Sequence, residues 1–323
     1  MSDAQDATID AGPSARRRLL QRVVPAVVTT LTLGWVAYTF DMGKVAAALS
    51  WQVMLVIVPS LLAYGAATLL LESWSLLRVI PNPPPGFGAW TAARIKCASY
   101  LLAIVNYVLG GAALSVLLKR RAGIGLGEAA GIVLLISMMD LLVVLVFGSV
   151  AAAWVADAGG PTVRAGVVAL AGVGFFGGLA LLRMPASLGP FERVRSLSVF
   201  EALRHTPGER LAELAALRVT FTISFIAMAG TAFYAFEIPI PISRLVVGTM
   251  ILAIVGAIPW AVSGLGPGQM FAVVVFRGIA EPETLIALSL VLSAGMIALR
   301  AAMGGIFARE YTREALAETR GRA

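Results

Sequence analysis

The sequence predicts an all-α integral membrane protein, in which six transmembrane helices and two re-entrant hairpins form an inverted repeat. Of its 323 residues, 59% are hydrophobic and only 13% are charged, whereas a soluble domain carries about 25% charged residues. The mean hydropathy is +0.88. Several apolar segments are long enough to cross a bilayer as a helix, which needs about 20 residues. Two others are interrupted by Gly, Pro or polar residues.

The chain divides into a terminal tail, one membrane domain and a second tail. Residues 1–15 are polar and small, so we expect them to be disordered. The membrane domain covers residues 16–310, and residues 311–323 form a charged cytoplasmic tail. A cleaved signal peptide is the alternative for the N-terminus, because the alanines at 46–48 resemble a cleavage site. The first apolar run is long enough to be a span, which favours an uncleaved helix.

Six segments are expected to span the membrane: residues 23–40, 53–77, 129–155, 163–182, 219–236 and 285–307. A basic loop, residues 183–217, separates the fourth from the fifth. Within it, apolar residues recur at helical spacing, with arginines off that stripe. These apolar residues are Phe191, Val194, Leu197, Phe200 and Leu203. The pattern predicts an amphipathic helix, either at the membrane interface or packed on the domain.

The two interrupted segments are the basis for the re-entrant hairpins. The first, residues 92–118, is broken at residues 106–111 and ends at Lys119. The second begins at residue 245 and is broken by a Gly- and Pro-rich stretch over residues 257–269. Its apolar arm after the break, 270–279, is too short to cross a bilayer. Broken backbone at membrane depth must be buried or line a wet cavity, and it indicates a binding site. The alternative is a loop between two ordinary spans.

The distribution of Lys and Arg predicts the orientation. With a cytoplasmic N-terminus and both interrupted segments re-entrant, most of the 25 Lys and Arg residues lie on the cytoplasmic side. Only Lys44, Arg164 and Arg244 lie outside, and Arg277 and Arg300 fall in or near apolar segments. We therefore expect an inner-membrane protein with both termini cytoplasmic. The order span, span, re-entrant segment, span then occurs over residues 20–156 and again, inverted, over 161–308.

Asp140 lies near the middle of the third predicted span. A carboxylate at that depth costs about 2.5–3.5 kcal/mol on insertion scales, so it must face the bundle interior or water. It is either a proton or substrate site or one member of a structural ion pair. Arg300 has a similar predicted depth in the last span, so we expect these two residues to pair. Glu72 lies nearer the cytoplasmic end, where it could reach Arg78 or extend to the interface.

Several classes of chemistry are disfavoured. The chain has one cysteine, Cys97, and one histidine, His205, so it has neither an intramolecular disulfide nor a metal cluster of His and Cys. We expect no cofactor and no catalytic activity. The GxGxxG motif at 172–177 lies inside an apolar span, so it is not a dinucleotide fingerprint. Its Gly174 and Gly178 form a GxxxG pair that predicts close helix packing. The net charge of +7 sits mostly in loops and indicates topology and anionic-lipid contact, not nucleic-acid binding.

Three short motifs carry a resemblance to a known family: residues 106–111, 139–142 and 263–269. In their order and spacing, the chain resembles the transmembrane flippase-like domain of lysylphosphatidylglycerol synthases, over about residues 20–310. Gly110-Gly111 stands where the family has a Leu-Pro-Gly-type turn, and Gln269 stands where it has an acidic residue. No aminoacyl-transferase domain is present in the sequence, so the resemblance implies lipid translocation and not lipid synthesis.

We therefore expect the protein to move a polar or anionic membrane lipid between leaflets. Arg94 and Lys96 would attract the headgroup, and Asp140 with Arg300 would form a gate or charge pair. The two broken loops would form a cavity at the bilayer midplane; their candidate substrate-binding residues are Asn106, Gly110, Gly111, Ser263, Gly264, Gly266 and Gln269. The alternatives are a secondary transporter of a small solute or ion, a membrane-embedded lipid-modifying enzyme, and a scaffold. Self-association into a homo-oligomer also stays open.

Overall fold

The computed structural model describes residues 30–31, 34–35, 37–81, 83–105, 107–155, 161–185, 192–258 and 265–320. This part of the chain is helical apart from its turns and one isolated bridge between Arg277 and Ala280. Five of its helical segments are long and apolar enough to cross a membrane. They coincide in position with the second to sixth predicted spans, whereas most of the first, 23–40, lies outside the described residues.

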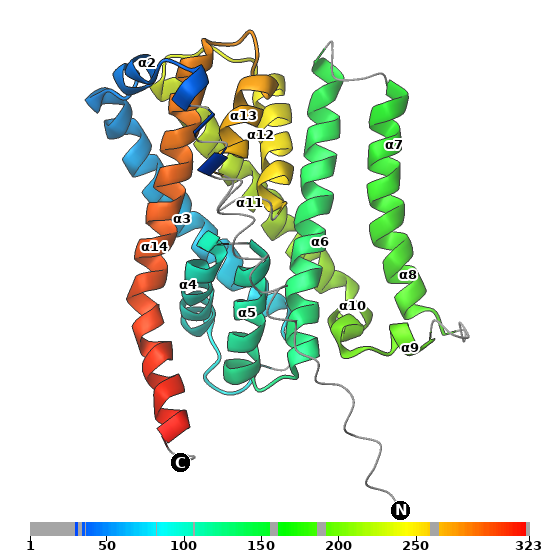
Figure 1. The fold of residues 1–323 in the computed structure, drawn as a ribbon. Helices are drawn as coiled ribbons and strands as arrows, with labels where there is room; N and C mark the ends of the chain where they lie inside the picture. The colour runs from blue at the N-terminus through cyan, green and yellow to red at the C-terminus, as the bar shows by residue number, and fades with distance from the viewer. Residues whose placement is uncertain are drawn as a thin grey trace, which may run out of the picture.

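The long helices are α3 (Trp51–Val79), α6 (Leu126–Ala151), α11 (Gly208–Ala235) and α14 (Pro282–Arg320). They cross one another, with α3 and α11 oblique to α6 and α14 (Figure 1). A fifth long segment consists of α7 (Pro161–Gly172), the π-helical turn η2 (Val173–Gly177) and α8 (Gly178–Arg183). α14 continues through the predicted tail as far as Arg320. A short helix, α2 (Met42–Ala47), precedes α3 and is capped by the Asp41 side chain.

Two pairs of shorter helices occupy opposite halves of the molecule (Figure 1). α4 (Ala89–Val105) and α5 (Tyr107–Ala122) pack against each other at the end where α6 begins. α12 (Ile242–Ala257) and α13 (Pro267–Val275) form the second pair, at the end where α6 finishes. Each pair coincides with one of the two interrupted segments. None of these four helices exceeds 17 residues, so each is shorter than the roughly 20 residues that a crossing needs.

The packing of the helices is reciprocal. The order α3, α4/α5, α6 recurs as α11, α12/α13, α14, and α3 packs along α11. α14, the last helix of the second series, packs along α4 of the first, and α6 packs along α12 in the same way. The order long helix, short pair, long helix therefore occurs twice among the described residues. Because each series packs against the short helices of the other, residues that are far apart in sequence meet in one interior.

The segment between α8 and α11 differs from the single amphipathic helix that the sequence predicted. It consists of α9 (Glu192–Arg195), η4 (Ser198–Phe200) and α10 (Glu201–His205). η4 and α10 pack on α6, and an added Cβ at Gly131 would lie 2.2 Å from the Val199 carbonyl oxygen. Leu203 is buried in the core beside α6. The predicted alternative, packing on the domain, therefore describes this segment better than a continuous interfacial helix does.

Among the described residues, the predicted GxxxG contact is not formed. Added Cβ atoms at Gly174 and Gly178 would meet nothing within 4 Å there, so no second described helix approaches either glycine closely. Close approaches occur at other glycines, including two within the short-helix pairs. An added Cβ at Gly110 would lie 2.5 Å from Ala103 Cβ, and one at Gly248 would lie 2.2 Å from the Phe276 ring.

Candidate functional site

Four charged side chains from four different helices meet inside the bundle: Glu72 of α3, Lys96 of α4, Asp140 of α6 and Arg218 of α11. We refer to them as the charge cluster. Lys96 Nζ lies 2.6 Å from Glu72 Oε2. Arg218 Nη1 lies 3.5 Å from Glu72 Oε1 and 3.5 Å from Asp140 Oδ1. Glu72 is therefore shared by two cations, and Arg218 is shared by two carboxylates.

The charge cluster is buried, and its four side chains differ in how much of each is exposed. The Arg218 side chain is 0% exposed and Glu72 is 10% exposed, whereas Lys96 reaches 15% and Asp140 reaches 25%. Charges at such positions are costly unless each is paired. Two formal negative and two formal positive charges balance within the cluster. Asp140 is its most accessible member and therefore the one that a solute or water reaches first.

Arg218 is held by backbone and hydroxyl groups as well as by carboxylates. Its Nη2 donates to the Leu71 carbonyl oxygen at 3.2 Å and to Ser75 Oγ. The guanidinium also lies 5.1 Å from the centroid of the Phe221 ring. A guanidinium carries five N–H donors. Among the described residues, its buried Nε and Nη1 atoms have no hydrogen-bond partner. Donors therefore remain that could bind an additional acceptor.

The helix register places Arg218 in the interior. Pro207 and Gly208 start α11 far before residue 219, where the fifth span was predicted to begin. Along α11, Leu211, Leu214 and Ala215 pack into the core, and Arg218 follows at the next position of the same helical stripe. The charge pattern placed Arg218 among the cytoplasmic basic residues, just before the predicted fifth span, so the sequence did not identify it as a site residue. Continuing the apolar spacing backwards from the span would have identified it.

The structure revises the predicted partners. Asp140 pairs with Arg218, and the predicted ion pair between Asp140 and Arg300 is not among those that the described residues form. Arg300 lies half-buried on α14, the helix that packs along α4. Glu72 reaches Lys96 and Arg218 in the interior. Its expected partner, Arg78, instead pairs with Glu213 at 3.2 Å, in an exposed position.

The other predicted site residues lie at several places. Arg94 is half-buried on α4, one turn or less from Lys96. Gly110 and Gly111 lie on α5, where Gly110 contacts α4 and Gly111 faces Val133 of α6. Asn106, Ser263 and Gly264 lie outside the described residues.

Gln269 has a local structural role at the start of α13. Its side chain is fully buried, and its Oε1 accepts a hydrogen bond of 2.6 Å from the backbone N–H of Gly266. Its Nε2 donates to Ser293 Oγ on α14 at 3.3 Å. Gly266 has φ +87°, a conformation that glycine adopts without strain. The amide thus satisfies the backbone of Gly266 and links the start of α13 to α14.

Among the described residues, no group of three or more His, Cys, Asp and Glu side chains could hold a metal ion. No protein-family model, no curated protein and no solved structure matches this chain.

Proposed function

We propose that this protein moves a polar or anionic lipid between the two leaflets of a membrane, without catalysing a covalent reaction. The observation that carries the proposal is Arg218, a fully buried cation with unused donors between two carboxylates. A headgroup that crosses an apolar bundle needs a polar binding site inside it. The broad apolar exterior of the helices keeps the rest of the protein in the lipid phase.

In this proposal, the pairs α4/α5 and α12/α13 are re-entrant hairpins that enter from opposite faces of the inner membrane. Both termini are cytoplasmic, so the end where α5 finishes faces the cytoplasm. The last turn of α5 there carries Lys119, Arg120 and Arg121. The inner ends of these short helices would then lie near the midplane, where broken backbone is tolerated only beside protein or water.

The charge cluster suggests how an anionic headgroup would bind. A phosphate can replace a carboxylate on a guanidinium, because both present paired oxygens to the planar donor group. Asp140 is the most exposed of the four and lies 3.5 Å from Arg218, farther than the 2.6 Å between Lys96 and Glu72. We infer that the headgroup displaces Asp140 from Arg218 while the Lys96–Glu72 pair persists. This exchange exposes no additional unpaired cation.

A second candidate function is secondary transport of a small solute or ion. The partly exposed Asp140 favours it, because a carboxylate at membrane depth is a common proton-relay group. The two functions differ in what crosses the membrane. A lipid would change leaflets without a proton gradient being required, whereas a proton-coupled solute would accumulate only when a gradient is imposed.

A leaflet-resolved assay tests the proposal. Purified protein is placed in liposomes containing a headgroup-labelled anionic phospholipid, and an impermeant quencher reports the outer-leaflet fraction over time. We expect the wild type to exchange the label and Arg218→Gln to abolish the exchange. The matched control is Arg78→Gln, which alters an exposed pair. Liposomes in which the wild type moves no labelled lipid, whether anionic or zwitterionic, would contradict lipid translocation.

A further inference from the structure

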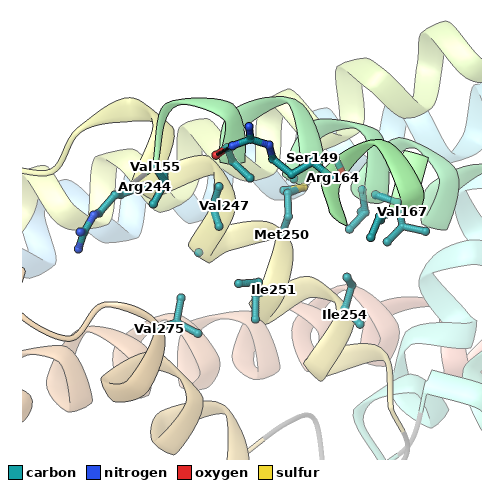
Figure 2. A pocket seen from close by; sticks show the side chains of 15 residues that line it. Ser149, Val155, Arg164, Val167, Arg244, Val247, Met250, Ile251, Ile254 and Val275 are labelled. Atoms are coloured by element: carbon teal, nitrogen blue, oxygen red, sulfur yellow. Dashed lines mark hydrogen bonds between the residues drawn. The ribbon is translucent and has the colours of Figure 1, made fainter. Parts of the chain in front are cut away.

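A cavity lies at the end where α6 finishes, well away from the start of that helix. It has a volume of about 440 Å³ and lies between α6 and α7 on one side and α12 with α13 on the other (Figure 2). Its wall is almost entirely aliphatic, with Val144 and Leu145 of α6, Val247, Ile251 and Ile254 of α12, and Val275 of α13. We refer to it as the α6–α12 groove.

The groove has the length of one lipid leaflet. Along α12 its lining extends from Arg244 to Ile254, which is about 15 Å at 1.5 Å per residue. The hydrocarbon core of a bilayer is about 30 Å thick, so one leaflet contributes about half of that. A slot of this length and apolar character matches a single acyl chain lying along the helices.

Two arginines line the groove. Arg164 is near the start of α7 and Arg244 is near the start of α12. In Figure 2, Arg164 lies over the groove near Ser149 and Val155, and Arg244 projects at one end. Arg164 Nη1 donates to the Ala152 carbonyl oxygen at 2.7 Å, which fixes the guanidinium beside the end of α6. No salt bridge among the described residues involves either arginine.

We propose that the α6–α12 groove binds one anionic phospholipid from the bilayer, with an acyl chain along Val247 and Ile251 and the phosphate between Arg164 and Arg244. The groove supplies an apolar wall for the chain, and the two cations supply charge complementarity for the headgroup. The alkyl chain of a detergent could pack against the apolar wall, but an uncharged detergent would not pair with the arginines. The site is independent of lipid transport, because it requires only that the protein lies in a membrane.

Native mass spectrometry of the detergent-purified full chain tests this site. The protein is titrated with phosphatidylglycerol or with phosphatidylcholine of the same acyl chains. We expect one phosphatidylglycerol to be retained in preference to phosphatidylcholine. Arg164→Gln and Arg244→Gln should each lower the affinity for phosphatidylglycerol about fivefold. Lys44→Gln removes a cation that does not line the groove, so it should leave the affinity unchanged.

A second variant tests the apolar wall. Ile251→Trp fills the groove and should abolish retention of both lipids, whereas Ile242→Trp, at a 70% exposed position of α12 that does not line the groove, should not. Equal retention by these two tryptophan variants would overturn the site. Two other results would also overturn it. One is that the wild type binds both lipids with equal affinity and that Arg164→Gln and Arg244→Gln do not change these affinities. The other is that the protein retains detergent and neither lipid. The glutamine variants leave the aliphatic wall intact, so they decide the headgroup contact even when Ile251→Trp does not fold.

Discussion

Lys96 Nζ lies 2.6 Å from Glu72 Oε2, so a buried ion pair ties the first short-helix pair to α3. The same carboxylate faces Arg218 through its other oxygen. One residue therefore joins α3, α4 and α11 in the interior. Removing it should affect the folded protein more than removing any exposed charge.

Glu72→Gln should strongly destabilise the protein. It leaves Lys96 without its partner and Arg218 with Asp140 alone, and breaking a buried pair typically costs about 3–5 kcal/mol. The double variant Glu72→Gln, Lys96→Met removes both members of the closer pair and should recover part of the loss. Thermal unfolding in detergent measures the three variants. Losses that simply add in the double variant would argue against a direct interaction.

The partner of Asp140 can be identified by rescue. Arg218→Met leaves Glu72 and Asp140 with only Lys96 to balance them, so its loss of stability should be reduced by adding Asp140→Asn. Arg300→Gln combined with Asp140→Asn should show no such rescue, because Asp140 pairs with Arg218. The measurement is again the unfolding temperature. A rescue of Arg300→Gln by Asp140→Asn would restore the partner that the sequence predicted.

The length and apolar character of the long helices were predictable from the sequence, whereas the ion-pair partners were not. Five membrane-length helices could be located because about 20 consecutive apolar residues have few other uses. The position of Asp140 likewise required a buried partner. Depth alone did not identify that partner, because it says nothing of which helices are neighbours. Arg218 was counted among the cytoplasmic charges because the predicted span began only after it. In the structure α11 begins earlier, and pairing with Glu72 and Asp140 compensates for the burial of this charge.

Cysteine labelling tests the orientation in our proposal. In a Cys97→Ser background, a cysteine at Lys44 should react in intact cells with a reagent that cannot cross the membrane. A cysteine at Arg120, in the last turn of α5, should react only after the membrane is opened. Both positions are exposed, so a difference reflects sidedness and not burial. Labelling of residue 120 in intact cells would contradict both the orientation and the re-entrant course of α4/α5.

Gly110 permits the close approach of α4 and α5, and its substitution should disturb the charge cluster indirectly. An added Cβ would lie 2.5 Å from Ala103 Cβ and 2.9 Å from its Cα, so Gly110→Leu must separate the two helices. Overpacking of this kind costs about 1–3 kcal/mol. Because Lys96 lies on α4, the displacement should also reduce lipid exchange in liposomes.

The neighbouring glycine provides a matched control for this effect. At Gly111 the nearest atom to an added Cβ is Val133 Cγ1 at 3.4 Å, an ordinary contact, and the position is helical. Gly111→Ala should therefore keep both stability and exchange, with a gain of up to about 1 kcal/mol from helix propensity. The paired measurement is thermal unfolding and exchange at equal protein per liposome. If Gly110→Leu matched Gly111→Ala in both, the contact between α4 and α5 would not position Lys96.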